Sequence, residues 1–186
     1  MQERAPAHHH VFDTAIGPCG VAWNARGLTA VQLPENDRAA TERRLAAKAA
    51  SAVAQPPPWV ATVIADIKRY LAGEPVDFST VAVDFSTLDP FRQKLYETMR
   101  SLAWGHTTTY GELARQLGST DWEGAREVGE AMGRNPVPVV IPCHRVLAAG
   151  GKLGGFSAPG GAKTKAKLLA LEGVHLDGGP PRLPGF

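Results

Sequence analysis

The chain has 186 residues, of which 44% are hydrophobic and 20% are charged, so it has enough apolar material for a packed core and is not expected to be disordered. Its 20 Lys and Arg residues against 18 Asp and Glu residues give a net charge of +2, which excludes a globally basic nucleic-acid-binding protein and leaves room only for a local basic patch. Two cysteines, Cys19 and Cys143, make no disulfide framework.

The N-terminal residues 1–7 are expected to form a loose tail, and the histidine run at residues 8–10 is interpreted as a solvated segment, not a metal site. No Cys or His spacing is typical of zinc binding, so we expect no metal. The sequence has no signal-peptide pattern and no apolar run long enough to span a bilayer. We therefore expect a cytoplasmic protein, in a reducing environment, that does not bind membranes.

The first part of the chain indicates a scaffold. Short apolar runs between Val11 and Pro34, separated by turn-forming residues, predict a small antiparallel sheet. Alanine-rich residues 37–54 predict a surface helix, and apolar residues at helical spacing over 59–71 predict a second helix. Residues 76–88 predict a crossing or an additional strand. No recognisable chemistry occurs in this part.

Capping signals mark the helices that follow. Asp89, which precedes a proline, predicts the N-cap of a helix. Thr109 with Glu112, and Thr120 with Glu123, have the spacing of two capping boxes and predict two short helices joined by a tight polar turn. This pattern is typical of a helix-turn-helix, although an ordinary pair of packed helices shares it.

The predicted fold class is α/β, of the α+β type. We expect an N-terminal α/β scaffold domain over residues 1–88, built on a small antiparallel sheet with helices. We expect a C-terminal domain over residues 89–186 that contains the helix-turn-helix and resembles a winged helix.

The run Ile-Pro-Cys-His-Arg-Val at residues 141–146 places one thiol between a proline and a histidine. Residues 135–141 are interpreted as a short extended element that ends at Cys143. Most cysteines simply pack in the core, but His144 and Arg145 do not suit an inert apolar pocket. Because positive or polarising neighbours lower the pKa of a thiol, we expect Cys143 to be a reactive nucleophile.

Two features follow the cysteine. Residues 148–161 are rich in glycine and predict a mobile loop whose backbone can approach a ligand, or else a plain connector. Residues 162–172 predict a helix with Glu172 in its last turn, where a carboxylate opposes the helix dipole. That position suggests a cationic or imidazole partner, and His144 is a candidate.

Together these residues resemble the signature of the O6-alkylguanine-DNA alkyltransferases, the methylated-DNA–protein-cysteine methyltransferases. The similarity lies in Asn-Pro-x-Pro followed by Ile-Pro-Cys-His-Arg-Val, and in residues 109–114, 124–129 and 168–173. The resemblance implies a monomeric DNA repair protein that transfers an alkyl group from O6-alkylguanine in double-stranded DNA to its own cysteine. The reaction would occur once per molecule and would need no metal or organic cofactor.

The resemblance also implies roles for the catalytic residues. Cys143 would be the alkyl acceptor, and His144, held by Glu172, would act as its base through a bridging water. Asn135 would be the hinge between the recognition helix and the active-site segment. Tyr110 would contact the flipped guanine and assist proton donation to its ring.

Other residues would contact DNA. Arg126 would enter the base stack through the minor groove, and Gly129 would lie beside the DNA on the same helix. The backbones of Val146 and Ser157 would line the base pocket, with Lys165 close to it.

The chain departs from the family pattern near the pocket. Phe156 stands where many members carry a tyrosine, and Ala158 and Pro159 are an apparent two-residue insertion that would reshape the pocket. Glu123 and Glu127 place acidic charge around the recognition helix and should weaken non-specific DNA binding.

Two alternatives stay open. One is a DNA lesion sensor of the same fold that does not transfer the alkyl group. The other is an unrelated cysteine hydrolase, which would need a remote histidine such as His106 or His175.

Overall fold

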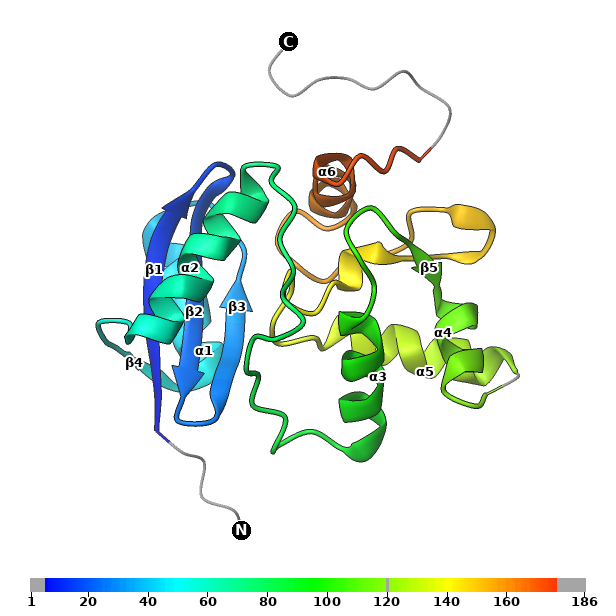
Figure 1. The fold of residues 1–186 in the computed structure, drawn as a ribbon, viewed down its shortest axis with the longest axis horizontal. Helices are drawn as coiled ribbons and strands as arrows, with labels where there is room; N and C mark the ends of the chain where they lie inside the picture. Colours follow the sequence, from blue (N-terminus) through cyan, green and yellow to red (C-terminus); the bar gives the residue numbers. More distant parts are fainter. Residues whose placement is uncertain (1–5, 120, 177–186) are drawn as a thin grey trace.

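The computed structural model describes residues 6–119 and 121–176. The elements in chain order are β1 (Ala7–Thr14), β2 (Gly17–Asn24), β3 (Gly27–Gln32), α1 (Arg38–Ala49), β4 (Ser51–Val53), α2 (Pro58–Leu71), α3 (Pro90–Arg100), β5 (Thr108–Thr109), α4 (Tyr110–Gln116), α5 (Trp122–Gly133), the 3-10 turn η1 (Cys143–Arg145), β6 (Val146–Leu147), the 3-10 turn η2 (Ala149–Gly151) and α6 (Ala162–Leu171). The sheet with α1 and α2 lies on one side of the molecule and α3 to α6 lie on the other (Figure 1).

A four-stranded sheet in the order β3-β2-β1-β4 forms the N-terminal part. The predicted antiparallel pairing is confirmed for β1, β2 and β3, whereas β4 runs parallel to β1 at the edge. The prediction of one helix over residues 37–54 is therefore wrong at its end. Helix α1 stops at Ala49 because Ala50 adopts the left-handed conformation, with φ at 48°, and the next residues form β4.

The histidine run is not a solvated tail, because β1 begins at Ala7 and carries all three histidines into the sheet. The His9 side chain is buried, and its Nδ1 lies 2.9 Å from the hydroxyl of Ser51 on β4. Alternation along a strand sends every second side chain to the same face, so one histidine faces inward while its neighbours do not. No cluster of three metal-ligating side chains occurs within residues 6–119 and 121–176.

The two faces of the sheet pack against different helices. On one face, Val11, Ala22 and Ala30 form a small cluster with Leu45 of α1. The other face packs on the apolar stripe of α2, whose buried residues are Val60, Val63, Ile64, Ile67, Tyr70 and Leu71.

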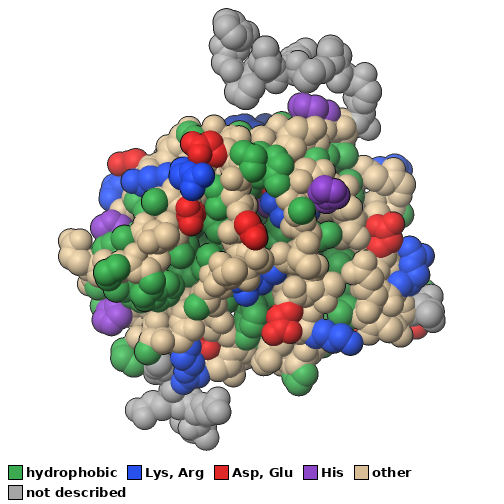
Figure 2. Space-filling model, in the orientation of Figure 1, with side chains coloured by type: hydrophobic (Ala, Val, Ile, Leu, Met, Phe, Trp, Pro, Cys, Tyr) green, Lys and Arg blue, Asp and Glu red, His purple; other side chains and the backbone are tan. Residues whose placement is uncertain are grey.

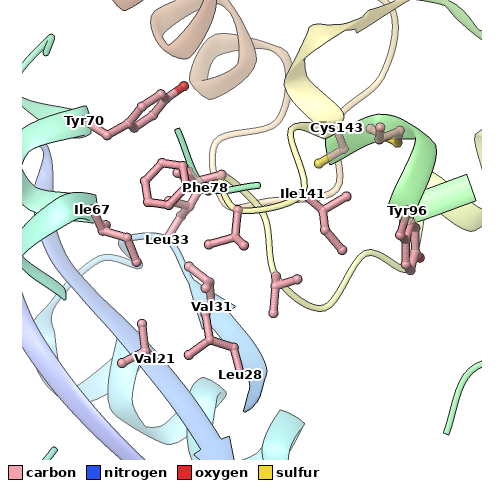
Figure 3. Packing of buried hydrophobic residues seen from close by; sticks show 14 of the residues in the cluster. Val21, Leu28, Val31, Leu33, Ile67, Tyr70, Phe78, Tyr96, Ile141 and Cys143 are labelled. Atoms are coloured by element: carbon pink, nitrogen blue, oxygen red, sulfur yellow. The ribbon is translucent and has the colours of Figure 1, made fainter. Parts of the chain in front are cut away.

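This second interface is part of a larger core that continues into the C-terminal half. The same cluster includes Leu95 and Met99 of α3, and Ile141 and Cys143 of the segment that follows α5 (Figure 3). Each large apolar side chain buried in it contributes about 1.5–3 kcal/mol. The N-terminal sheet and Cys143 are therefore fixed relative to each other by one continuous core.

Local capping positions the C-terminal helices. Asp89 caps α3 and the reciprocal Thr109–Glu112 capping box opens α4, so both predictions are confirmed. For α5 the N-cap is Asp121, whose side chain accepts from a backbone N–H in the first turn. Thr120, the predicted cap, lies outside the described residues. Helices α4 and α5 pack directly on each other.

The segment between α2 and α3 passes between the two halves (Figure 1). The strand considered for residues 76–88 is reduced to one isolated bridge between Val83 and Leu28. Lys, Arg, Asp and Glu side chains are mixed over the face shown in Figure 2. Within the described parts of the chain, no helix has the length and apolar character needed to cross a bilayer.

Candidate active site

The segment before the cysteine is a compact turn, not the extended element that was expected. The Ile141 N–H donates to the Val137 carbonyl at 2.9 Å, and Val139 has a φ of 76°. A β-branched residue rarely adopts this left-handed conformation, so the turn must be held from outside. Asn135 supplies that restraint, since its side chain donates to the Ile141 carbonyl at 2.9 Å and accepts from the Val137 N–H at 3.0 Å.

Cys143 is the first residue of the 3-10 turn that follows and is 5% exposed. It opens into a cavity of about 320 Å³, whose other lining residues are Tyr110, Gly129, Met132, Gly133, Gly155, Phe156 and Ser157. The structure thus brings the predicted Tyr110, Gly129 and Ser157 together around the thiol. A larger cavity of about 510 Å³ lies against Pro142 and Arg145, but Cys143 does not line it.

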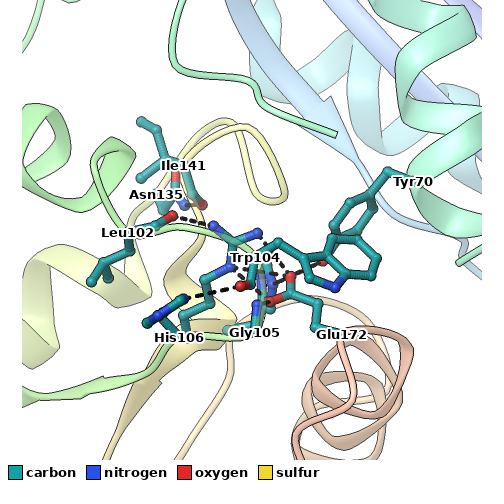
Figure 4. Close-up of polar contacts among 10 residues, drawn as sticks. Tyr70, Leu102, Trp104, Gly105, His106, Asn135, Ile141 and Glu172 are labelled. Atoms are coloured by element: carbon teal, nitrogen blue, oxygen red, sulfur yellow. Dashed lines mark hydrogen bonds and ion pairs between the residues drawn. The ribbon is translucent and has the colours of Figure 1, made fainter. Parts of the chain in front are cut away.

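The side chain of His144 is fully buried beside Glu172, as expected from the helix position of that carboxylate. His144 Nε2 lies 2.7 Å from Glu172 Oε1 and 2.9 Å from the hydroxyl of Tyr70. The Tyr70 hydroxyl donates to the same Glu172 oxygen at 2.5 Å. Tyr70 comes from α2 of the N-terminal half, so both halves of the chain build this polar cluster (Figure 4).

Glu172 is the centre of the cluster. Arg145 Nε donates to Glu172 Oε2 at 2.9 Å, and the backbone N–H of Gly105 donates to the same oxygen at 3.1 Å. Burial alone would raise the pKa of Glu172, but the hydrogen bonds from His144, Arg145 and Tyr70 outweigh it and lower the pKa to about 2. The carboxylate is therefore charged at any physiological pH.

The hydrogen bonds also assign the histidine tautomer. Since the Tyr70 hydroxyl donates to Glu172, it accepts from His144, and the proton of the neutral imidazole then lies on Nε2. Burial lowers the pKa of His144, against the raising effect of Glu172, which favours this neutral form. The lone pair is left on Nδ1, which is buried and has no hydrogen-bond partner among the described residues.

The thiol does not have the environment expected from its sequence neighbours. Burial raises the pKa of Cys143, and the opposing contributions come first from Asn135 and Lys165. Arg145 is directed to Glu172, so it neutralises that carboxylate and does not activate the thiol. Cys143 therefore rests as a neutral thiol and needs a base to become nucleophilic.

Lys165 is a buried cation under the pocket. Its ammonium donates to the carbonyl of Val146 at 2.6 Å and to that of Gly155 at 3.1 Å, and it lies 5.8 Å from the centre of the Tyr110 ring. Burial lowers the pKa of Lys165 to about 8. The prediction that Val146 lines the base pocket is wrong for this cavity: Val146 is not among the residues that line the space around Cys143, and its carbonyl accepts from the Lys165 ammonium.

Arg126 lies apart from the cavity, on the exposed face of α5. Its guanidinium is 3.2 Å from Glu130 and 5.9 Å from the centre of the exposed Trp122 ring. The two histidines considered for a hydrolase, His106 and His175, are exposed and do not line the cavity of the thiol. The structure therefore gives no support to a hydrolase.

Comparison with known proteins covers both halves of the chain. A family model described as the DNA binding domain of 6-O-methylguanine DNA methyltransferase matches residues 90–174. A second, described as the ribonuclease-like domain of the same enzyme, matches residues 7–85.

Individual relatives and solved structures agree. The methylated-DNA–protein-cysteine methyltransferase of Methanothermobacter thermautotrophicus is 35% identical over 86% of this chain and 81% of its own. The namesake from Mycobacterium tuberculosis is 33% identical over 89% of this chain and 92% of its own. The crystal structure of the O6-methylguanine methyltransferase of M. tuberculosis superposes with a TM-score of 0.70 at 31% identity, covering 89% of this chain and 92% of that one. A crystal structure of the M. tuberculosis protein in complex with DNA gives a TM-score of 0.69 at 32% identity, over 89% and 93% of the two chains.

Proposed function

The chain belongs to the 6-O-methylguanine DNA methyltransferase family, and we propose that it transfers an alkyl group from O6 of guanine in double-stranded DNA to the sulfur of Cys143. The observation that carries this proposal is the position of the thiol. Cys143 lines a cavity with Tyr110 and Ser157, and the next residue in sequence is His144, which forms a buried pair with Glu172. Sulfur is the common side-chain nucleophile best suited to attack an alkyl carbon at neutral pH.

The chemistry begins with loss of the thiol proton. A water between the Cys143 sulfur and the free Nδ1 of His144 passes this proton to the imidazole, and Glu172 stabilises the imidazolium. The thiolate attacks the alkyl carbon in one step, so a sulfur–carbon bond forms as the carbon–O6 bond breaks. The electron pair of that bond stays on the guanine, which takes up one proton with the help of the Tyr110 hydroxyl. The thioether is stable, so each molecule reacts once.

DNA binding is proposed for the face formed by α4 and α5. The target base must leave the duplex to reach the cavity, which costs a few kcal/mol. Arg126 is exposed on α5 and is suited to fill the vacated space, provided that it leaves Glu130. The crystal structure of the M. tuberculosis relative with DNA supports a DNA partner for this fold. Nothing in the described residues favours a sensor that lacks transfer.

The test is transfer in a single turnover. The protein is incubated with a duplex that contains one O6-methylguanine, and intact and peptide masses are recorded. We expect one methyl group per molecule, on Cys143. The variant Cys143→Ala should bind the duplex and accept no methyl group, whereas Cys19→Ala should react normally because Cys19 is buried in β2. Repeated turnover, or methylation of another residue, would reject the proposal.

We also propose that the protein acts as a monomer. Its exposed large apolar residues among those described are Val53, Trp59 and Trp122, which lie on three different elements. Such scattered residues do not make the contiguous apolar patch of a stable interface. Sedimentation of the free protein should give the mass of one chain, and a dimer would contradict this part of the proposal.

A further inference from the structure

A second cavity reaches Cys143 from the side of the N-terminal half. It has a volume of about 170 Å³ and lies between β3, α1 and the loop at residues 156–159. We call the cavity of about 320 Å³ around Cys143, described above, the first cavity. The second cavity shares Gly133, Cys143, Phe156 and Ser157 with it, so the two meet at the thiol. A single water needs only about 10–15 Å³ of such volume, so this cavity has room for a group of several atoms.

The two cavities differ in charge. No charged side chain lines the first one, whereas Arg44, Lys48 and Arg134 line the second, together with no acidic residue. The guanidinium of Arg44 is already paired with Glu35 at 3.1 Å. Lys48 and Arg134 form no ion pair with any residue that the structure describes, and the Lys48 ammonium makes only a long contact, 3.4 Å, to the carbonyl of Val31.

Lys48 is close enough to the thiol for its charge to act there. Burial raises the pKa of Cys143, and the positive charge of Lys48 is among the contributions that oppose this rise. Burial also lowers the pKa of Lys48 to about 8, which leaves the ammonium mostly protonated at pH 7. The second cavity therefore places a charged donor in the same space as the thiol that attacks the alkyl carbon.

The geometry of the proposed reaction requires a second opening at the sulfur. In a one-step displacement, sulfur, carbon and O6 lie on one line, so any substituent on the carbon points away from that line. If the guanine occupies the first cavity, a substituent larger than hydrogen needs separate space beside the thiol. A methyl group carries only hydrogens and needs none.

We propose that the second cavity receives the substituent of the transferred carbon and that Lys48, assisted by Arg134, selects O6-alkyl groups that end in a carboxylate, such as carboxymethyl. This proposal rests on the proposed function. The thiolate attacks the methylene carbon, the sulfur–carbon bond forms and the carbon–O6 bond breaks. The electron pair stays on the guanine, which takes up the proton that the thiol lost. The products are guanine and S-carboxymethylcysteine at position 143.

The test compares three single-lesion duplexes in single-turnover kinetics of the full chain. They carry O6-methyl-, O6-carboxymethyl- or O6-carbamoylmethylguanine, the last being a neutral analogue of nearly the same shape as carboxymethyl. A charge-assisted hydrogen bond is about twice as strong as a neutral one. We therefore expect the wild-type protein to react about tenfold faster with the carboxymethyl than with the carbamoylmethyl lesion.

Variants then assign this preference to a residue. Lys48→Met should abolish this preference. Because the Lys48 charge also opposes the raised pKa of the thiol, this variant should slow all three reactions, but the carboxymethyl reaction should slow about tenfold more than the other two. Lys48→Arg should retain most of the preference, and Lys167→Met, which removes an exposed charge on α6, should have no effect. Equal wild-type rates for the two larger lesions, or an unchanged preference in Lys48→Met, would overturn the proposal. So would an equal loss for all three lesions, since Lys48 would then act on the thiol or on DNA. Failure of the wild type with the methyl lesion would instead reject the proposed function.

Discussion

The substitution Glu172→Gln should destabilise the protein strongly at neutral pH. The pKa of this carboxyl falls from 4.5 to about 2 in the folded state, and each pKa unit is worth about 1.4 kcal/mol, so its charge contributes about 3 kcal/mol. The contacts give a similar figure, because removal of one partner of a buried ion pair costs about 3–5 kcal/mol. Arg145, 6% exposed at its side chain, would be left without its carboxylate.

The effect should also depend on pH in one direction. Because the folded-state pKa is the lower one, the contribution of the carboxylate is complete above the unfolded value of 4.5 and is lost as the pH falls toward 2. Urea denaturation at pH 7 should therefore show a difference of about 3 kcal/mol between Glu172→Gln and the wild type. The difference should shrink as the pH is lowered below about 5.

Glu74→Gln provides a matched control. The Arg69–Glu74 pair has the same 2.9 Å separation as the Arg145–Glu172 pair, but its side chains are 54% and 55% exposed. Exposed pairs contribute little, so this variant should unfold nearly as the wild type does. If both variants lost the same stability, or if the loss in Glu172→Gln did not change with pH, the charge of Glu172 would not be what stabilises the cluster.

Three further substitutions test the proposed roles. Arg126→Ala should slow repair of duplex DNA but not of free O6-methylguanine base, since only stacked DNA needs a residue to fill the gap; equal losses in both kinetic assays would argue against this role. Tyr110→Phe should keep DNA affinity, measured by fluorescence anisotropy, and lower the transfer rate by about 10²-fold, whereas an unchanged rate would exclude the hydroxyl as a proton donor. Asn135→Ala removes two buried hydrogen bonds and should lower the free energy of unfolding, measured by urea denaturation, by about 1–3 kcal/mol. An unchanged free energy of unfolding would show that the turn before Cys143 does not depend on the Asn135 side chain.

Features fixed by short-range hydrogen bonds could be predicted from the sequence. The caps at Asp89 and Thr109 depend on atoms within one helical turn, so their residue types suffice to locate the starts of α3 and α4. The antiparallel strands likewise follow from apolar runs between turn residues. The partner of Glu172 was inferred in the same way, from a carboxylate placed where the helix dipole opposes it.

The turn before Cys143 shows where local inference fails. Residues 135–141 are apolar enough to read as extended, yet Val139 is left-handed and the chain turns back. The residue type of Val139 does not indicate this conformation, since valine prefers extended backbone. The two hydrogen bonds of the Asn135 side chain, to the Ile141 carbonyl and from the Val137 N–H, override that preference. The Asn-Pro step was the available signal, since it favours the start of a turn.

The neighbours of the site also escaped prediction because they are distant along the chain. Tyr70 occupies an apolar position of α2 and lies 102 residues from Glu172, so its spacing identifies it only as core. A fully buried tyrosine needs a partner for its hydroxyl, which is the one indication the sequence offers. Similarly, the cations that act on the thiol are Lys48 and Lys165, not the adjacent Arg145.

The hydrogen bond from Tyr70 to Glu172 and the continuous core have a consequence for cleavage of the backbone. A protease that cuts once in the connecting segment at residues 72–89 would sever the peptide link but leave these contacts in place. The two fragments should therefore remain associated, and should melt in one transition. A C-terminal fragment made alone would lack the hydroxyl that orients its histidine.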